Sequence, residues 1–302
     1  MKSLFQKMRN AFIEGVRQPA CWAFLAIFTF SALALAFAGH SKFVIIYSLM
    51  ALAIIAGCIG TVAVTEPPPP ADMSLTKKTV GLEVLLVSLC IVLSGAIGLF
   101  FHRAIEPIGG FMPALVWERL ASWTGHSTNP AWYLAALNPI LYCLLPLLLI
   151  VPISRFKHLG FVRGHRVLLV AALWCAQPVI TFSIAIATGQ FSLTESRIQG
   201  LITGFALNFF QNGLFEEFLF RACLQTRLVL LFGPYRGIAM GAVAFGVWHL
   251  GLNFSRTGNL GSGLALSLIA HAVSGVGFGV MYYRTRNIAA GSILHVVGNT
   301  LA

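Results

Sequence analysis

The sequence is poor in charged residues, and acidic residues are the scarcest of these. Only 10% of its 302 residues are charged, and nine are Asp or Glu. About a quarter of a typical soluble domain is charged, so this composition excludes an ordinary soluble domain. The chain is instead 58% hydrophobic, with a mean hydropathy of +0.84. Such values are typical of a protein that resides in a membrane.

Two further absences narrow the class of protein. The six cysteines form no CxxC pair, so they offer neither a disulfide framework nor a thiolate metal site, and free thiols are expected. The net charge of +11 is not gathered in one basic block, because Lys and Arg lie in short loops between apolar segments. That spacing is typical of membrane topology, and no nucleic-acid partner is expected.

Long apolar runs are present instead. Several exceed the length of about 18 residues that crosses the hydrocarbon core. They lack the short alternating strands of a membrane β-barrel, so the sequence predicts an all-α polytopic membrane helix bundle with eight or nine transmembrane helices. The predicted segments are 21–39, 43–65, 80–101, 134–153, 167–188, 201–231, 237–253, 262–283 and 288–302, the last being short for a span.

The basic residues indicate an orientation. With the N-terminus placed inside, 15 Lys and Arg residues fall on the cytosolic side and five on the other. This asymmetry predicts a cytosolic N-terminus. The first segment is expected to be a retained anchor and not a cleaved signal peptide.

Two of the connections between apolar segments are longer than the rest. The stretch "TEPPPPADMSLTKKT" (65–79) predicts a stiff cytosolic linker. The stretch "PALVWERLASW" (113–123) is compatible with an amphipathic helix at the outer surface or with an ordered loop at headgroup level.

Few ionisable side chains lie inside the apolar segments. Each costs roughly 2.5–3.5 kcal/mol at the bilayer centre, so each needs an explanation. Glu83, near the start of its segment, is interpreted as structural or interfacial, and Asn208 and Asn212 as interhelical hydrogen-bonding residues. His271 has no companion one turn away and is interpreted as bonded across helices. The others are Glu216, Glu217, Arg221, His249 and His295.

The segment "NGLFEEFLFRACL" (212–224) carries three of these side chains. Glu217 and Arg221 are spaced i, i+4, so they share one helix face and can form a pair. A salt bridge that only locks helix packing would explain these two residues but not Glu216. A carboxyl group buried beside another negative charge suits general acid and base work near neutral pH.

The following segments place histidines at the same spacing. "FGVWH" sets Phe245 one turn before His249, and "HVVGN" sets His295 one turn before Asn299. Counted from the helix ends at about 1.5 Å per residue, these side chains and the glutamates are expected at mid-membrane or somewhat toward the cytosol.

Three motifs in this order resemble the CAAX protease and bacteriocin-processing (CPBP, Abi-domain) family of intramembrane glutamic endopeptidases. They are EExxxR at 216–221, FxxxH at 245–249 and HxxxN at 295–299, and the resemblance covers roughly residues 195–302. It implies that Glu216 and His249 activate a water molecule, that Glu217 and Arg221 pair and orient the site, and that His295 and Asn299 hold the oxyanion. The chain is expected to divide into variable N-terminal transmembrane helices (1–190) and a catalytic core (191–302).

The resemblance also implies the setting. The substrate would be a membrane-anchored or membrane-delivered protein or peptide in the lipid bilayer, cut from the cytosolic side, and the membrane a bacterial inner membrane. No cofactor is expected; a zinc-dependent mechanism is the alternative, although the HExxH helix of zinc proteases is absent from the sequence. Two other functions remain open: a non-catalytic immunity or chaperone-like membrane protein, and a proton-coupled transporter, because buried Glu and His residues also mark ion pathways.

Overall fold

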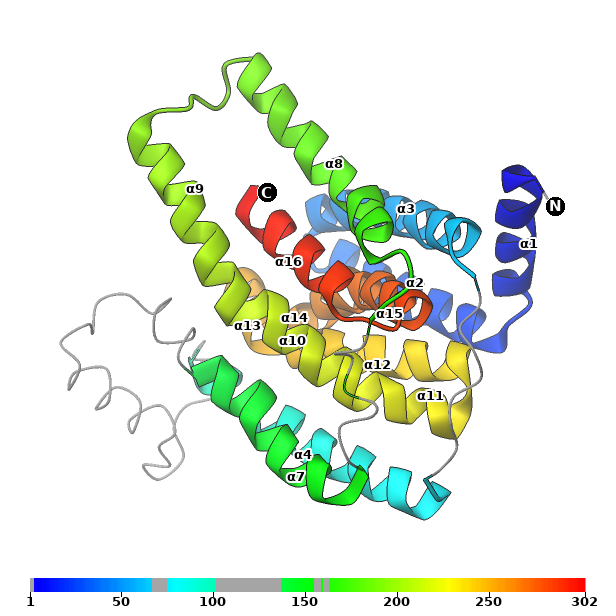
Figure 1. Cartoon of the computed structure of the whole chain (residues 1–302). Helices are drawn as coiled ribbons and strands as arrows, with labels where there is room; N and C mark the ends of the chain where they lie inside the picture. Colours follow the sequence, from blue (N-terminus) through cyan, green and yellow to red (C-terminus); the bar gives the residue numbers. More distant parts are fainter. Residues whose placement is uncertain (1–2, 67–74, 102–136, 155–158, 160–162, 302) are drawn as a thin grey trace.

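The chain folds into a bundle of helices (Figure 1). The computed structural model describes all residues except 1–2, 67–74, 102–136, 155–158, 160–162 and 302. All regular secondary structure in this described part is helical, as predicted. The N-terminal helices are α1 (Leu4–Val16), α2 (Pro19–Phe37), α3 (Ser41–Val64), α4 (Lys77–Phe101), the π-helical segment η1 (Ile140–Leu144), α7 (Leu145–Ser154) and α8 (Val167–Ala187).

The C-terminal part contains two long helices that change to π-helical geometry along their length. One runs through α9 (Glu195–Asn208), η3 (Phe209–Gly213), α10 (Leu214–Glu217), η4 (Phe218–Gln225) and α11 (Thr226–Phe232). The other runs through α14 (Leu260–Ser267), η5 (Leu268–Ala272) and α15 (Val273–Thr285). Helices α12 (Pro234–Trp248) and α13 (Leu250–Thr257) lie between them in the sequence, and α16 (Ala289–Leu301) follows. Local π-helical geometry is frequent at functional sites.

Several helices can cross a membrane. By length and composition, five of the described helices qualify, or six if the bent pair α12 and α13 counts as one span. The predicted count of eight or nine is therefore not confirmed, although each predicted segment is helical over most of its described residues. The run from Glu195 to Phe232 is not among the qualifying helices, and α16 has only 13 residues. The qualifying helices are Pro19–Phe37, Ser41–Val64, Lys77–Leu99, Val167–Ala187 and Leu260–Thr285.

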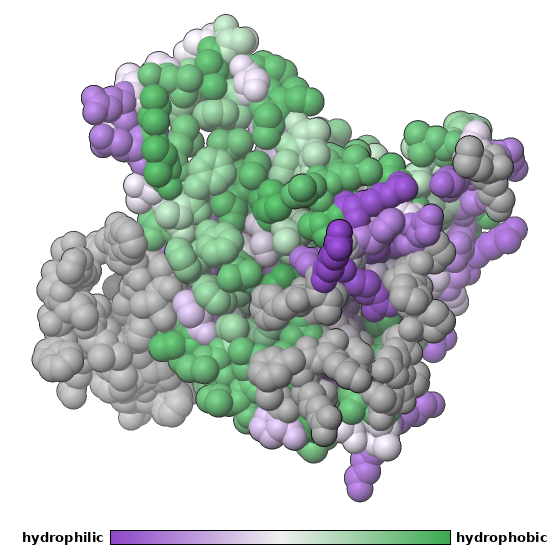
Figure 2. Space-filling view, viewed as in Figure 1, coloured by the Kyte–Doolittle hydropathy of each residue, from purple (hydrophilic) through white to green (hydrophobic). Residues whose placement is uncertain are grey.

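The candidate spans differ in how far the protein buries them. Only 6% of the apolar window of α3 is buried, against 67% for the run from α14 to α15. The latter is therefore a central helix, whereas α3 directs most of its side chains outward. The surface is accordingly rich in apolar residues, as Figure 2 shows for one face of the described part. A lipid bilayer is the environment in which such a surface is stable.

The predicted segment 237–253 is not one continuous helix, which corrects the sequence interpretation. α12 ends at Trp248 and α13 begins at Leu250, with a bend of 49° between them. His249 has φ −82° and ψ 9°, and its backbone N–H donates to the carbonyl oxygen of Gly246 at 3.0 Å. Tertiary packing holds the bend: a Cβ atom at Gly251 would lie 2.7 Å from the carbonyl oxygen of Gly98 in α4.

Helix α1 was not predicted from hydropathy, because it is not an apolar run. A capping box starts it: the Ser3 hydroxyl accepts from the Gln6 N–H at 3.2 Å, and the Gln6 side chain accepts from the Ser3 N–H at 3.1 Å. The helix packs against α3. Two predicted connections lie wholly or partly outside the described residues: residues 67–74 of the linker, and the stretch 113–123, for which an amphipathic helix or an ordered loop was expected.

A buried ion pair joins two of the long helices. Glu83 of α4 is fully buried, and its Oε2 atom lies 3.0 Å from Nε of Arg227 in α11. Arg227 also donates to the carbonyl oxygen of Ala222 at 2.8 Å. This buried pair confirms a structural role for Glu83.

We expect Glu83→Ala to destabilise the protein by about 3–5 kcal/mol, because it removes the carboxylate partner of a buried guanidinium. Thermal unfolding of the purified protein in detergent measures this effect. The matched control is Glu195→Ala, which removes an exposed carboxylate from α9 and should change stability by about 1 kcal/mol or less. Equal unfolding temperatures for the two variants would contradict the structural role of Glu83.

Candidate active site

Glu216 and Glu217 lie between two π-helical segments, η3 and η4, in the interior of the protein. Glu216 is 3% exposed and Glu217 is fully buried. Two glycines let α16 approach this helix closely. A Cβ atom at Gly291 would lie 2.6 Å from Oε2 of Glu217, and one at Gly213 would lie 3.1 Å from the carbonyl oxygen of Ser292. The close contact brings the residues of α16 to the two carboxylates.

Arg221 holds Glu217, as the i, i+4 spacing predicted. Nε of Arg221 lies 3.3 Å from Oε2 of Glu217, and both side chains are buried. The guanidinium carbon also lies 4.8 Å from the ring centroid of Phe245 and 5.5 Å from that of Phe278. Aromatic faces attract cations, so these rings stabilise the buried charge. The first residue of the FxxxH motif thus has a function of its own, which is to cover Arg221.

Glu216 faces two histidines. Its Oε2 atom lies 3.9 Å from Nε2 of His249 and 3.7 Å from Nε2 of His295. The sequence analysis expected only His249 at this carboxylate. Nδ1 of His295 also lies 3.7 Å from Oε1 of Glu217, so His295 stands between the two glutamates. All three separations exceed a normal hydrogen-bond length.

The asparagines before the glutamates have different roles. Nδ2 of Asn208 donates to the Thr300 hydroxyl at 3.0 Å, which confirms the predicted bond between helices. Asn212 instead forms a hydrogen bond with Glu216 on the same helix. With its amide nitrogen turned toward the carboxylate, it donates to Oε1 of Glu216 at 3.1 Å. The interhelical interpretation of Asn212 was therefore wrong. Its spacing of four residues from Glu216 was the signal that could have found this contact.

The backbone fixes the ring of His249. Its Nδ1 atom lies 2.8 Å from the carbonyl oxygen of Phe245, one turn earlier. A carbonyl oxygen only accepts, so Nδ1 carries the hydrogen and Nε2 presents a lone pair toward Glu216. The FxxxH spacing therefore sets the tautomer of the histidine as well as its position.

His271 has a companion after all, on another helix. Its ring stacks on the ring of His249, with centroids 3.9 Å apart and an angle of 7° between the planes. Its Nε2 atom is buried and has no hydrogen-bond partner among the described residues. The spacing within one helix does not reveal this pair, because its two residues lie on different helices. The presence of an ionisable side chain inside an apolar segment was the available signal.

A large cavity connects these side chains. Its volume is about 1830 Å³, and its polar residues include Glu216, His249, His271 and His295. Asn299, one turn beyond His295, lies on the same wall, but no hydrogen bond or ion pair joins it to the other predicted site residues among those described. Most of the remaining wall is apolar and includes Ile54, Leu141, Trp174, Phe278 and Leu294. A mostly apolar wall with a few convergent polar groups is typical of a substrate site.

A metal site needs several donor side chains around one point. Among the described residues, no group of three or more His, Cys, Asp or Glu side chains has an arrangement that can hold one. The buried polar atoms at the site have charged neighbours instead, as Arg221 has in Glu217.

Comparison with known proteins agrees with the motifs. Residues 198–301 match a family model described as type II CAAX prenyl endopeptidase Rce1-like. No curated protein and no solved structure matches the chain. The matched residues include all six predicted site residues and His271, and they cover about a third of the chain. Residues 198–301 are thus similar to an Rce1-like domain of the type II CAAX prenyl endopeptidases, which agrees with the resemblance that the motifs carry.

Proposed function

We propose that the chain is an intramembrane endopeptidase that hydrolyses a peptide bond in a membrane-anchored or membrane-delivered protein or peptide. One observation carries the proposal: in an Rce1-like domain, the buried carboxylate of Glu216 faces Nε2 of both His249 and His295 on the wall of a large cavity. A buried carboxylate beside imidazoles in a cleft is a candidate acid–base centre.

The separations suit a water molecule held between the side chains. Oε2 of Glu216 and Nε2 of His249 are 3.9 Å apart, so one water oxygen can lie within hydrogen-bond distance of both. In the proposed step Glu216 accepts a proton from this water, and the water oxygen attacks the carbonyl carbon of the scissile peptide bond. The proton then passes to the leaving nitrogen as the C–N bond breaks.

The other charged residues hold the site in place. Arg221 pairs directly with Glu217, and Glu217 faces Nδ1 of His295. A carboxylate in this position favours the tautomer or cation in which Nδ1 carries a hydrogen. We propose that His295 and Asn299 stabilise the oxyanion that forms on the substrate, since an imidazole N–H and a side-chain amide are suitable donors.

The transporter alternative has one observation in its favour, the helix break at His249. Transporters bind their substrates at such discontinuities, but usually in pairs related by an internal repeat. Among the described residues this is the single bent pair that passes the test for a broken span. In the proposed protease, the helix break directs the side chain of His249 toward Glu216.

We expect Glu216→Gln to reduce peptide cleavage by about 100-fold or more, because the amide cannot accept the proton of the water. His249→Phe should have a similar effect while retaining an aromatic ring at this position. The assay follows cleavage of membrane-anchored reporter peptides by the purified protein in detergent.

The matched control is Glu195→Gln, which removes an exposed carboxylate at the start of α9, far along the helix from the site. Thermal unfolding of every variant shows that the protein is folded. Full cleavage by both Glu216→Gln and His249→Phe would refute the proposed mechanism, and proton flux without cleavage would favour the transporter.

We expect a chelator to leave the rate unchanged, because the proposed water is activated by Glu216 and His249 alone. The rate is measured before and after dialysis against a zinc-binding chelator, with and without added Zn²⁺. Loss of activity that Zn²⁺ restores would instead support the zinc-dependent alternative.

We expect His271→Ala to lower kcat up to about tenfold with little change in KM, since an aromatic contact worth about 0.5–1.5 kcal/mol positions His249. His271→Phe keeps a ring against His249 and should restore most of the rate. If both variants lose activity equally, the stacking contact does not position His249.

A further inference from the structure

Helix α1 carries an apolar stripe that the rest of the described protein leaves uncovered. Leu4, Phe5, Met8 and Phe12 form it, and all are exposed, from 38% for Met8 to 75% for Phe5. Intervals of four residues place Leu4, Met8 and Phe12 along one side of the helix, and Phe5 lies next to them. An exposed apolar stripe of this kind indicates contact with a membrane or with another protein.

Two basic side chains border the stripe. Lys7 and Arg9 stand on either side of Met8 in the sequence, and at about 3.6 residues per turn they fall on opposite flanks of the stripe. Both side chains are exposed, and neither forms an ion pair with an acidic residue of the described part. Cations in such positions reach lipid headgroups while their aliphatic stems cover apolar surface. The pattern is therefore typical of a helix that lies in a membrane interface.

The second half of α1 attaches to the bundle. The Tyr235 hydroxyl, at the start of α12, donates to Oε1 of Glu14. Nε1 of Trp22 in α2 donates to the carbonyl oxygen of Val16 at 2.8 Å. Ile13 and Val16 are partly buried, and α1 packs against α3. None of these side chains belongs to the stripe, so the helix is held in place while its apolar side chains stay available.

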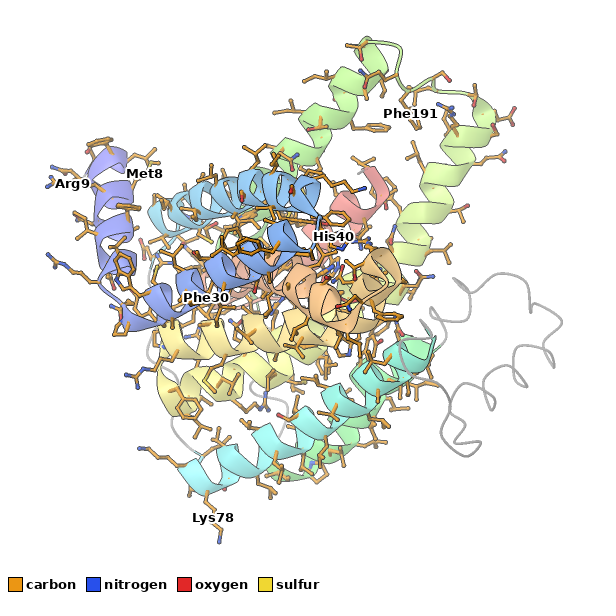
Figure 3. All side chains as sticks on the ribbon, turned by 180° about the vertical axis from the view of Figure 1, so that it is seen from behind. Met8, Arg9, Phe30, His40, Lys78 and Phe191 are labelled. Atoms are coloured by element: carbon orange, nitrogen blue, oxygen red, sulfur yellow. The ribbon has the colours of Figure 1, made fainter. Side chains whose placement is uncertain are left out.

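The direction of α1 differs from that of the candidate spans beside it. Figure 1 and Figure 3 both show α1 upright at the edge of the bundle, whereas α2 and α3 run across the view. Only 11% of the apolar window of α2 and 6% of that of α3 are buried, so both direct most of their side chains outward. A helix that lies across the ends of such spans lies near the membrane surface. Trp22, 57% exposed at the corner between α1 and α2, is a residue type favoured at headgroup level.

We propose that α1 binds the anionic headgroup region of a phospholipid bilayer. The apolar stripe enters the boundary between headgroups and acyl chains, and Lys7 and Arg9 pair with lipid phosphates. Two observations favour lipid over a second copy of the chain: α1 adjoins the exposed apolar surface of α2 and α3, and cations border the stripe on both flanks. This surface is separate from the candidate active site, so the proposal does not depend on the proposed function.

Photo-crosslinking of the full chain identifies what covers the stripe. The photoreactive residue p-benzoylphenylalanine replaces Phe5 in the stripe, Asn10 on the polar side of α1, or Phe30 of α2, which is 72% exposed. In vesicles that contain phosphatidylglycerol, mass spectrometry should find lipid adducts at Phe5 and Phe30 and far fewer at Asn10. A crosslink from Phe5 to a second copy of the chain, or lipid adducts at Phe30 without any at Phe5, would overturn the proposal.

Lipid titration tests the two cations. The full chain in detergent is titrated with phosphatidylglycerol while its unfolding temperature is followed, since a lipid that binds the native state stabilises it. Lys7→Gln combined with Arg9→Gln should raise the half-maximal lipid concentration about tenfold or more. The matched control, Lys42→Gln combined with Arg197→Gln, removes two exposed cations from α3 and α9 and should respond like the unsubstituted chain. Equal responses of the two double variants, or no response of the unsubstituted chain, would overturn the proposal.

Discussion

The buried ion pair between Arg221 and Glu217 is the interaction on which the site depends. The guanidinium binds Glu217 and lies against the rings of Phe245 and Phe278, so it joins three helices around one charge. Burying such a charge is costly unless it is paired. This cost explains why an apolar segment carries two adjacent glutamates and an arginine: Glu217 neutralises Arg221, and Glu216 is left to face the cavity.

The same geometry links the motifs to one another. Phe245 covers Arg221, and its carbonyl oxygen fixes the ring of His249. His295 stands between Glu216 and Glu217. The EExxxR and FxxxH motifs therefore each supply both a group that faces the cavity and a group that holds a neighbouring residue. A change in any one of them alters the environment of the others, which is why their effects on activity are not expected to be additive.

The sequence predicted what depends on local spacing. The pair formed by Glu217 and Arg221 followed from an i, i+4 interval, and the helical segments followed from apolar runs. The bend at His249 did not, because close packing of Gly251 against α4 holds it. The stacking of His271 on His249 joins residues on different helices, so no spacing within one helix reveals it. The count of eight or nine spans stays unconfirmed, because only five or six of the described helices are long and apolar enough to cross a membrane.

The account makes Glu216 the base that activates a water molecule, with His249 as its partner. An experimental structure of the protein in a lipid environment, at a resolution that shows ordered water, tests this claim most directly. We expect a water oxygen within about 3.2 Å of both Oε2 of Glu216 and Nε2 of His249. A metal ion coordinated at that position, or a direct contact between the two side chains that excludes water, would contradict the account.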